Sequence, residues 1–174
     1  DHAIKACETA LAMQARLVEL NAEWEAEAKA EGQVHHPVII GIGLNTGRAS
    51  VGNFGSEQRI QYSCLGDEVN LAARIEGQCK PYSVGIIIGE NTRAAAPGFA
   101  TLELDLVMVK GKTEPVRVFE PLPEEAADSP ELRAWLAAFR LLENGDPAAE
   151  AAFAAIVEAD PDDRLARLHL RRLR

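Results

Sequence analysis

The sequence is short of aromatic residues, of cysteine and of long apolar runs. Phe, Trp and Tyr make up 5% of the 174 residues, although hydrophobic residues of all kinds make up 47%, a balance typical of a globular protein. No apolar run approaches the roughly 20 residues that span a bilayer. Cys7, Cys64 and Cys79 are widely spaced and form no CxxC pair, which argues against a disulfide framework and a zinc site and favours a reducing compartment.

Basic residues are also scarce. Lys and Arg number 18 against 27 Asp and Glu, giving a formal net charge of -9, so a nucleic-acid-binding surface is not expected. The one basic cluster, Arg171, Arg172 and Arg174, is expected at a helix end, where cations complement the dipole. The chain begins at Asp1 without Met or a signal-peptide pattern. We therefore expect a cytoplasmic piece of a longer protein, with any membrane segment upstream.

Helical and strand patterns alternate over the first 121 residues. Residues 1–30 read as a long amphipathic helix with Ile4, Leu11, Leu17, Val18 and Leu20 on its apolar stripe. A second helix is expected from Asp67, as its cap, to about Cys79, with Pro81 ending it, and a short third helix over 91–95. Strands are expected at 38–44, 48–54, 59–65 and 84–88, with a terminal hairpin of 102–109 and 116–119. This alternation predicts an α/β sandwich.

The composition changes after residue 121. An acidic, Pro-containing stretch, 122–128, reads as a linker, and residues 129–174 carry three helical patterns. The helix, turn, Ala-rich helix and Asp-Pro-Asp-Asp sequence resembles a single tetratricopeptide-like unit, which cannot bury a repeat core alone. We expect this tail to serve packing or protein contact.

Closely spaced glycines near residue 43 invite a phosphate-binding interpretation. Gly41, Gly43 and Gly47 miss the spacing of both the dinucleotide-binding fingerprint and the P-loop. Close backbone packing in a buried strand, with a turn at Gly47, is the favoured interpretation.

Asn70 and Arg74 are the first candidate site residues. Four residues apart on the expected helix, they share a face one turn apart, where an amide and a guanidinium can grip a sugar oxygen and a phosphate. Spacing alone leaves another interpretation open, in which Arg74 pairs with Glu57 or Asp67 on a solvated face.

Five motifs follow one another along the first 120 residues: IGIGLNTG at 40–47, VGNFG at 51–55, Arg59 with Tyr62 and Ser63, GDEVNLAARIE at 66–76, and KGKTEPV at 110–116. In this order they resemble the class III adenylyl and guanylyl cyclase catalytic domain, and the bacterial adenylyl cyclases among them. The resemblance implies an α+β, ferredoxin-like cyclase fold that is N-terminally incomplete in this chain, with an all-α tail.

The resemblance assigns roles to four residues. It implies that Asn70 orients the ribose, that Arg74 stabilises charge developing at the α-phosphate, and that Lys110 binds triphosphate oxygens. Ser63 falls on the base-reading position, closest to the Thr type of a large bacterial group. Its hydroxyl can donate or accept a hydrogen bond, so it fixes purine choice less firmly than Asp would.

The family's metal-binding residues are not among these motifs. The resemblance implies two divalent cations, Mg or Mn, held by two Asp residues upstream of this chain, while Asp67 and Asp146 follow Gly only as decoys. It also implies ATP as the substrate and a homodimer whose active sites form between the two catalytic domains. This chain by itself is expected to be inactive. Two alternatives stay open: a degenerate cyclase-like module without catalysis, and a guanylate cyclase.

Overall fold

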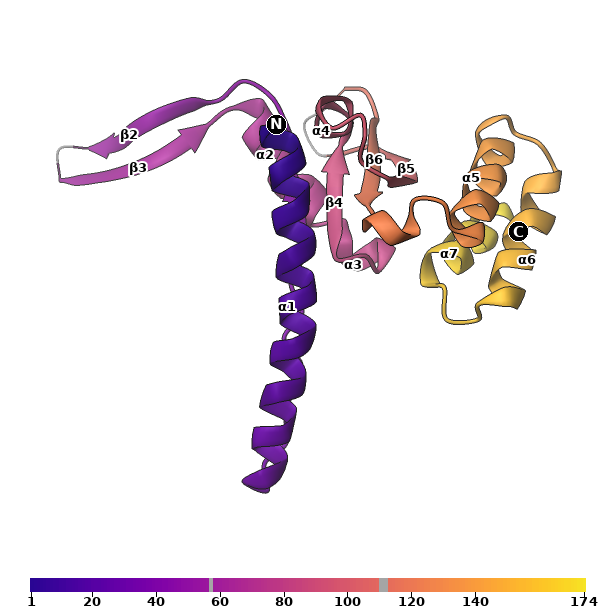
Figure 1. Ribbon diagram of the computed structural model, residues 1–174. Coiled ribbons are helices and arrows are strands. Elements are labelled where there is room, and N and C mark those ends of the chain that lie inside the picture. Colours follow the sequence, from indigo (N-terminus) through magenta and orange to yellow (C-terminus); the bar gives the residue numbers. More distant parts are fainter. Residues whose placement is uncertain (57, 110–112) are drawn as a thin grey trace.

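The computed structural model describes residues 1–56, 58–109 and 113–174. It contains a four-stranded sheet, a separate two-stranded hairpin, four helices before the sheet ends and three helices in the tail (Figure 1). The strands are β1 (Ile42–Leu44), β2 (Ser50–Ser56), β3 (Arg59–Leu65), β4 (Ile86–Gly89), β5 (Thr101–Val107) and β6 (Val116–Pro121). The helices are α1 (His2–Ala30), α2 (Asp67–Glu76), α3 (Cys79–Tyr82), α4 (Glu90–Ala95), α5 (Pro130–Glu143), α6 (Ala148–Ala159) and α7 (Arg164–Leu173), with a 3-10 turn, η1 (Glu124–Ala126).

The sheet is mixed, in the order β1-β4-β6-β5. β1 pairs with β4 in parallel, and β6 pairs antiparallel with both β4 and β5. Side chains of a strand alternate between two faces, and those of β4 pack alternately into two different apolar clusters. Ile86 and Ile88 pack with the α1 residues Cys7 and Ala10, whereas Ile87 packs in a second cluster. The predicted mixed α/β fold with a helical tail is confirmed.

The second cluster joins the sheet to the tail. Leu71 and Ile75 of α2 pack with Ile87, Leu104 and Val118 of the sheet. The same cluster includes aromatic residues of the tail, so one apolar core runs from α2 through the sheet to α5 and α6. Trp135, Phe139 and Phe153 are its tail aromatics.

Helix α1 has the predicted bounds but only part of the predicted core face. Its buried residues are Ala3, Cys7 and Ala10, all small and all in the first three turns, while Val18 is 71% exposed. The remainder of α1 extends away from the sheet (Figure 1). The expected stripe is therefore realised only in part: Leu11 packs against the cluster of Cys7 and Ala10, whereas the fully buried positions are small because helix and sheet pack closely here.

The expected strand 38–44 forms only over Ile42–Leu44. The preceding residues instead follow α1. The Asn21 side chain bonds both the N–H and the carbonyl of Val38, each at 2.8 Å, and Gln14 Nε2 donates to the Ile40 carbonyl at 3.0 Å. Side chains of α1 thus take the backbone groups that a strand partner would use.

Two details of the second helix were also wrong. Gly66 is the N-cap and Asp67 the first helical residue, with no side-chain capping bond, although an acid there still suits the helix dipole. Pro81 does not end a helix but lies inside the single turn α3. A proline is accepted there because the first N–H groups of a helix have no intrahelical partner.

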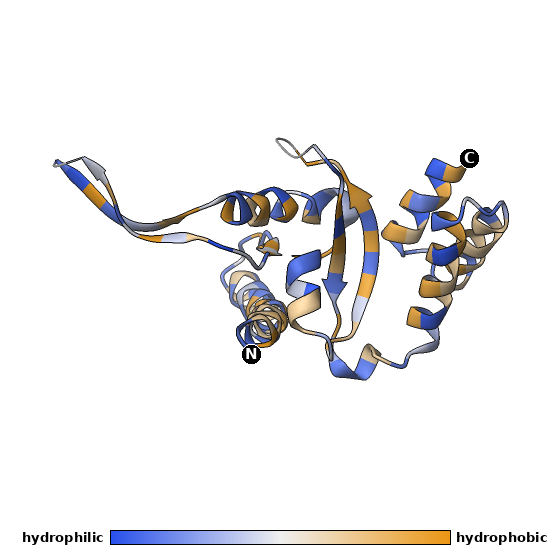
Figure 2. Cartoon of the chain, turned by 90° about the horizontal axis from the view of Figure 1, so that it is seen from above, coloured by the Kyte–Doolittle hydropathy of each residue, from blue (hydrophilic) through white to orange (hydrophobic). Residues whose placement is uncertain are grey.

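The β2–β3 hairpin stands apart from the sheet. It pairs antiparallel from Ser50↔Leu65 to Ser56↔Arg59, and it carries apolar residues although it projects into solvent (Figure 2). Val51, Ile60 and Tyr62 are 62%, 63% and 76% exposed. An isolated hairpin is marginally stable in water, so this apolar ribbon is a surface that a second molecule would stabilise.

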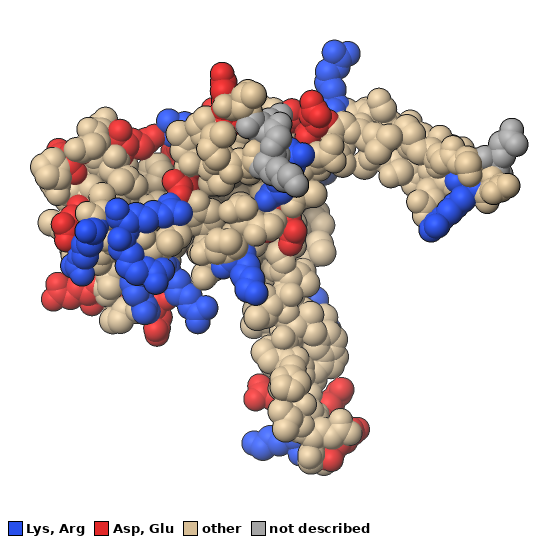
Figure 3. Space-filling view, turned by 180° about the vertical axis from the view of Figure 1, so that it is seen from behind, with Lys and Arg blue, Asp and Glu red and all other residues tan. Residues whose placement is uncertain are grey.

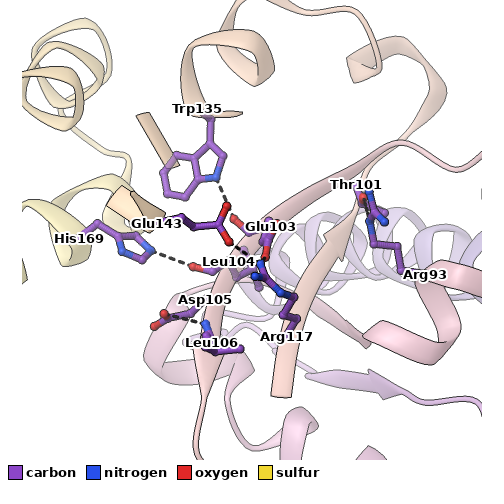
Figure 4. Close-up of polar contacts among 10 residues, drawn as sticks. All are labelled: Arg93, Thr101, Glu103, Leu104, Asp105, Leu106, Arg117, Trp135, Glu143 and His169. Carbon is purple, nitrogen blue, oxygen red and sulfur yellow. Dashed lines mark hydrogen bonds and ion pairs between the residues drawn. The ribbon is translucent and has the colours of Figure 1, made fainter. Parts of the chain in front are cut away.

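The tail is fastened to β5, the edge strand. Trp135 Nε1 donates to the Glu103 carbonyl at 2.9 Å, and His169 Nε2 lies 2.9 Å from the Leu104 carbonyl (Figure 4). These carbonyls lie at an irregularity in the β5–β6 register between Glu103 and Asp105. The bulge turns backbone acceptors toward the tail.

Ion pairs surround these two bonds. Arg117 donates to Glu103 and to Glu143 of α5, and Arg172 of α7 donates to Asp105. Burial and its hydrogen bond to Asp105 raise the pKa of Tyr82 to about 12. Burial lowers the pKa of His169, so this histidine is neutral at physiological pH and packs as an aromatic ring.

Glu120 lies at the same junction and carries a perturbed carboxyl group. It lines a cavity of about 410 Å³ with Asp162, Asp163 and Arg164 from the start of α7. Desolvation by burial, with a smaller repulsion from Asp163, raises the pKa of Glu120 to about 7. Between pH 4.5 and 7, the Glu120 carboxyl group therefore keeps its proton in the folded chain, whereas the unfolded chain has released it.

This shift predicts a pH-dependent effect of Glu120→Gln. Because the folded pKa lies above the unfolded value of 4.5, the parent loses stability as pH rises from 4.5 through 7. Urea unfolding should find the variant more stable than the parent by about 3 kcal/mol at pH 8 and equal to it at pH 4. Glu125→Gln, at an exposed position, is the matched control. Equal effects of the two substitutions at pH 8 would contradict the assignment.

Candidate functional site

The α2 helix carries the two central candidate residues. Leu71 and Ile75 face the core, at 6% and 0% exposure, and fix the orientation of the helix. Asn70 comes one residue before Leu71, and Arg74 one residue before Ile75. Because successive helical residues are rotated by about 100°, Asn70 and Arg74 form a second row along α2 that faces away from the core. Asn70 is exposed and Arg74 is half-buried.

Neither side chain has a competing partner among the residues that the structure describes. Within the described part of the chain, no hydrogen bond or ion pair engages the Asn70 amide or the Arg74 guanidinium. The interpretation that Arg74 pairs with Asp67 is therefore not realised, and Glu57 lies outside the described residues. An amide and a guanidinium one turn apart are presented to solvent with their donors available.

Ser63 and Lys110 are placed differently. Ser63 is exposed on β3, opposite Gly52 of β2 and four residues before α2 begins. No hydrogen bond joins its side chain to Asn70 or Arg74 in the ranges that the structure describes. Lys110 lies outside the described residues.

Two glycines, which have no side chain, allow α2 to pack closely against β1 and the loop after it; this contact is called the glycine seat. A Cβ on Gly43 would lie 2.3 Å from the Ala72 carbonyl oxygen and 2.7 Å from the Glu76 nitrogen. A Cβ on Gly47 would lie 2.2 Å from Glu68 Cγ. The close packing predicted for Gly43 and Gly47 is thus confirmed, although β1 is half-buried and not the buried strand that was expected.

Gly43→Ala tests this seat. The added methyl group would meet backbone atoms of α2, which cannot rotate aside as a side chain can. Unfolding in urea should show a loss of about 1–3 kcal/mol. Gly98→Ala is the control, because a Cβ there has nothing within 4 Å. A Gly43→Ala protein as stable as Gly98→Ala would show that α2 is not held closely.

The described residues do not fit a metal centre by themselves. Among residues 1–56, 58–109 and 113–174, no three His, Cys, Asp or Glu side chains gather closely enough to hold a metal ion. Lys and Arg side chains concentrate over the tail (Figure 3), where Arg164, Arg167 and Arg171 are exposed on α7 and Arg174 is exposed just after it. Within the same ranges, every helix is too short or too polar to span a bilayer.

Comparison with known proteins decides the family. Residues 1–119 match the family model of the adenylate and guanylate cyclase catalytic domain. The chain belongs to this family. Asn70, Arg74, Ser63 and the glycine seat all lie in the matched part of this cyclase domain, and the tail lies beyond it.

Several relatives are named adenylate cyclases. The cyclase domain is 40% identical over 95 residues to the terminal-differentiation-specific adenylate cyclase of Dictyostelium discoideum, which is 52% of this chain and 4% of that protein. It is 31% identical over 120 residues to adenylate cyclase 1 of Rhizobium meliloti, covering 68% of this chain and 17% of the relative. It is 34% identical over 119 residues to the adenylate cyclase of Anabaena cylindrica, covering 66% of this chain and 23% of the relative.

Solved structures share the fold. The adenylyl cyclase CyaB from P. aeruginosa matches with a TM-score of 0.62 and 30% identity, over 70% of this chain and 59% of that one. The guanylyl cyclase Cya2 matches with a TM-score of 0.54 and 34% identity, over 71% of this chain and 60% of that one. The cyclase domain thus spans under a quarter of the three curated relatives and about three-fifths of these structures.

Proposed function

We propose that this chain is part of an adenylate cyclase that converts ATP to 3′,5′-cyclic AMP and pyrophosphate. The ribose 3′-oxygen loses its proton and forms a bond to the α-phosphorus, while the bond from that phosphorus to the bridging oxygen breaks. The observation that supports this most directly is the row of Asn70 and Arg74, which has no partner among the described residues and lies on a helix packed closely against β1.

Each residue has a role that its chemistry suits. The Asn70 amide can donate to and accept from the ribose, which orients the 3′-hydroxyl. The Arg74 guanidinium stays charged and is planar, so it suits the oxygens of the α-phosphate as negative charge builds on them. A fixed donor of this kind is commonly worth several kcal/mol in the transition state.

The proposed substrate is ATP, with Ser63 reading the base and Lys110 binding the triphosphate. Several relatives with this domain are named adenylate cyclases, which favours ATP, whereas similarity to a guanylyl cyclase keeps GTP as the alternative. The reaction is proposed to take place in the cytoplasm.

A homodimer is part of the proposal. The row on α2 lies on open surface, and the nearby hairpin exposes apolar residues such as Ile60 and Tyr62. A second copy packed against the hairpin would bury them and enclose the substrate. The proposal also includes two divalent cations in the complete protein. Because residues 1–56, 58–109 and 113–174 gather no carboxylate set that fits them, no step is assigned to the cations.

The complete protein, assayed with Mn²⁺ and either ATP or GTP, tests the proposal. We expect cyclic AMP and pyrophosphate in equal amounts, and turnover of ATP at least about tenfold faster than that of GTP. Faster turnover of GTP would make the protein a guanylate cyclase. Nucleotide binding without product would instead favour a regulatory module, an alternative motivated by the lack of a carboxylate cluster in the described chain.

A further inference from the structure

Asn45, just beyond the end of β1, reaches across to the first turn of α2. Its Nδ2 donates to the Glu68 side chain, at 2.6 Å from Oε2, and lies 3.2 Å from the Glu68 backbone carbonyl. Both bonds end on one residue, the second of α2. A bond to a carboxylate is stronger than one between neutral groups, so this contact ties the loop after β1 to the start of the helix.

Two glycines leave this pair little room to move. A Cβ on Gly89, at the end of β4, would lie 2.4 Å from Asn45 Oδ1. The Glu68 side chain is held against Gly47 in the same way. The Asn45 amide is therefore confined between the end of β4 and the first turn of α2.

The contact lies close to the residues of the proposed reaction. Glu68 precedes Asn70 by two residues and Arg74 by six, on the same ten-residue helix. A helix moves largely as a rigid unit, so a shift of its first turn carries both side chains with it. Misplacement of a reacting group by about 1 Å can cost about 100-fold in rate.

We propose that Asn45 is a positioning residue of the cyclase, which holds α2 through Glu68 so that Asn70 and Arg74 meet the substrate in register. This inference rests on the proposed function. Asn45 itself touches no reacting atom in the proposal. It affects kcat by fixing the orientation of α2. If the contact served stability alone, its loss would not change kcat more than KM.

The test is Asn45→Asp in the complete protein, which sets one carboxylate against another. We expect kcat to fall at least about tenfold at pH 8.5 with KM changed less than about threefold. Like charges raise the pKa of one member of such a pair, so the defect should shrink at pH 6, where the two carboxyl groups share a proton. Asn91→Asp, at an exposed position on α4, is the matched control and should leave kcat and its pH profile unchanged.

A second substitution provides the rescue. Adding Glu68→Gln to Asn45→Asp places an amide donor opposite the new carboxylate, which restores a hydrogen bond with the donor and acceptor exchanged. We expect kcat of the double variant to return to within about threefold of the parent. A double variant that folds but stays as slow as Asn45→Asp would overturn the proposal, as would a fall in kcat that is independent of pH.

Hydrogen exchange separates this proposal from the cyclase assignment. In Asn45→Asp, backbone amides of α2 should exchange at least about tenfold faster than in the parent, and the double variant should recover the parent rate. This result does not depend on activity. A parent without cyclase activity would reject the proposed function, whereas unchanged exchange in α2 would reject the positioning role even in an active enzyme.

Discussion

Arg74→Ala is expected to lower kcat of the complete enzyme by about 100-fold or more, while KM for ATP rises less than about fivefold. In the proposed reaction, the guanidinium meets charge that exists only as the α-phosphorus gains a fifth ligand. Its loss therefore affects the transition state more than the bound substrate. Steady-state formation of cyclic AMP over a range of ATP concentrations separates the two parameters.

Arg74→Lys sharpens this test. Lysine keeps the charge but loses the planar fork of donors, so it should recover only part of the lost turnover. Thermal unfolding serves as the control for both variants, because Arg74 has no ion pair or hydrogen bond in the described part of the chain to lose. Full turnover in Arg74→Ala would remove the assigned role.

Trp135→Ala is expected to lower the free energy of unfolding of this chain by about 3–5 kcal/mol. The indole is 2% exposed, packs edge-on against Phe153 and His169 with ring centroids 5.4 and 5.6 Å away, and donates to the Glu103 carbonyl. The substitution removes a large buried ring and leaves a backbone acceptor without its donor.

Trp24→Ala is the matched control, since the second tryptophan lies on α1 and is 37% exposed. Urea unfolding should find it within about 1 kcal/mol of the parent. If both substitutions cost the same, the tail would not be packed as part of the domain core.

The order of helices and strands could be predicted because each one carries a local pattern. The apolar run at Ile86–Ile88 and the polar breaks around it mark β4 without knowledge of its neighbours. Residues 38–41 show the limit of such patterns. They have the composition of a strand, yet side chains of α1 take their backbone groups, and that competition depends on residues 17 and 26 positions away.

The candidate site divides in the same way. Asn70 and Arg74 could be found because their spacing is that of one helical turn and their motif is specific. Asn45 could not, since its partner lies 23 residues further along the chain and only the packing of α2 on β1 brings the two together. Packing was among the roles expected for the tail, but its docking place on β5 could not be predicted, because it depends on a bulge that no residue pattern marked.

The bulge has a further consequence for the solubility of the protein. An edge strand with free carbonyl groups is a template on which a strand of another molecule can add. On β5, the indole of Trp135 and the imidazole of His169 occupy two of these acceptors. A shortened protein ending at Pro121 would bare this edge, and we expect it to aggregate by strand addition where the longer chain stays dispersed.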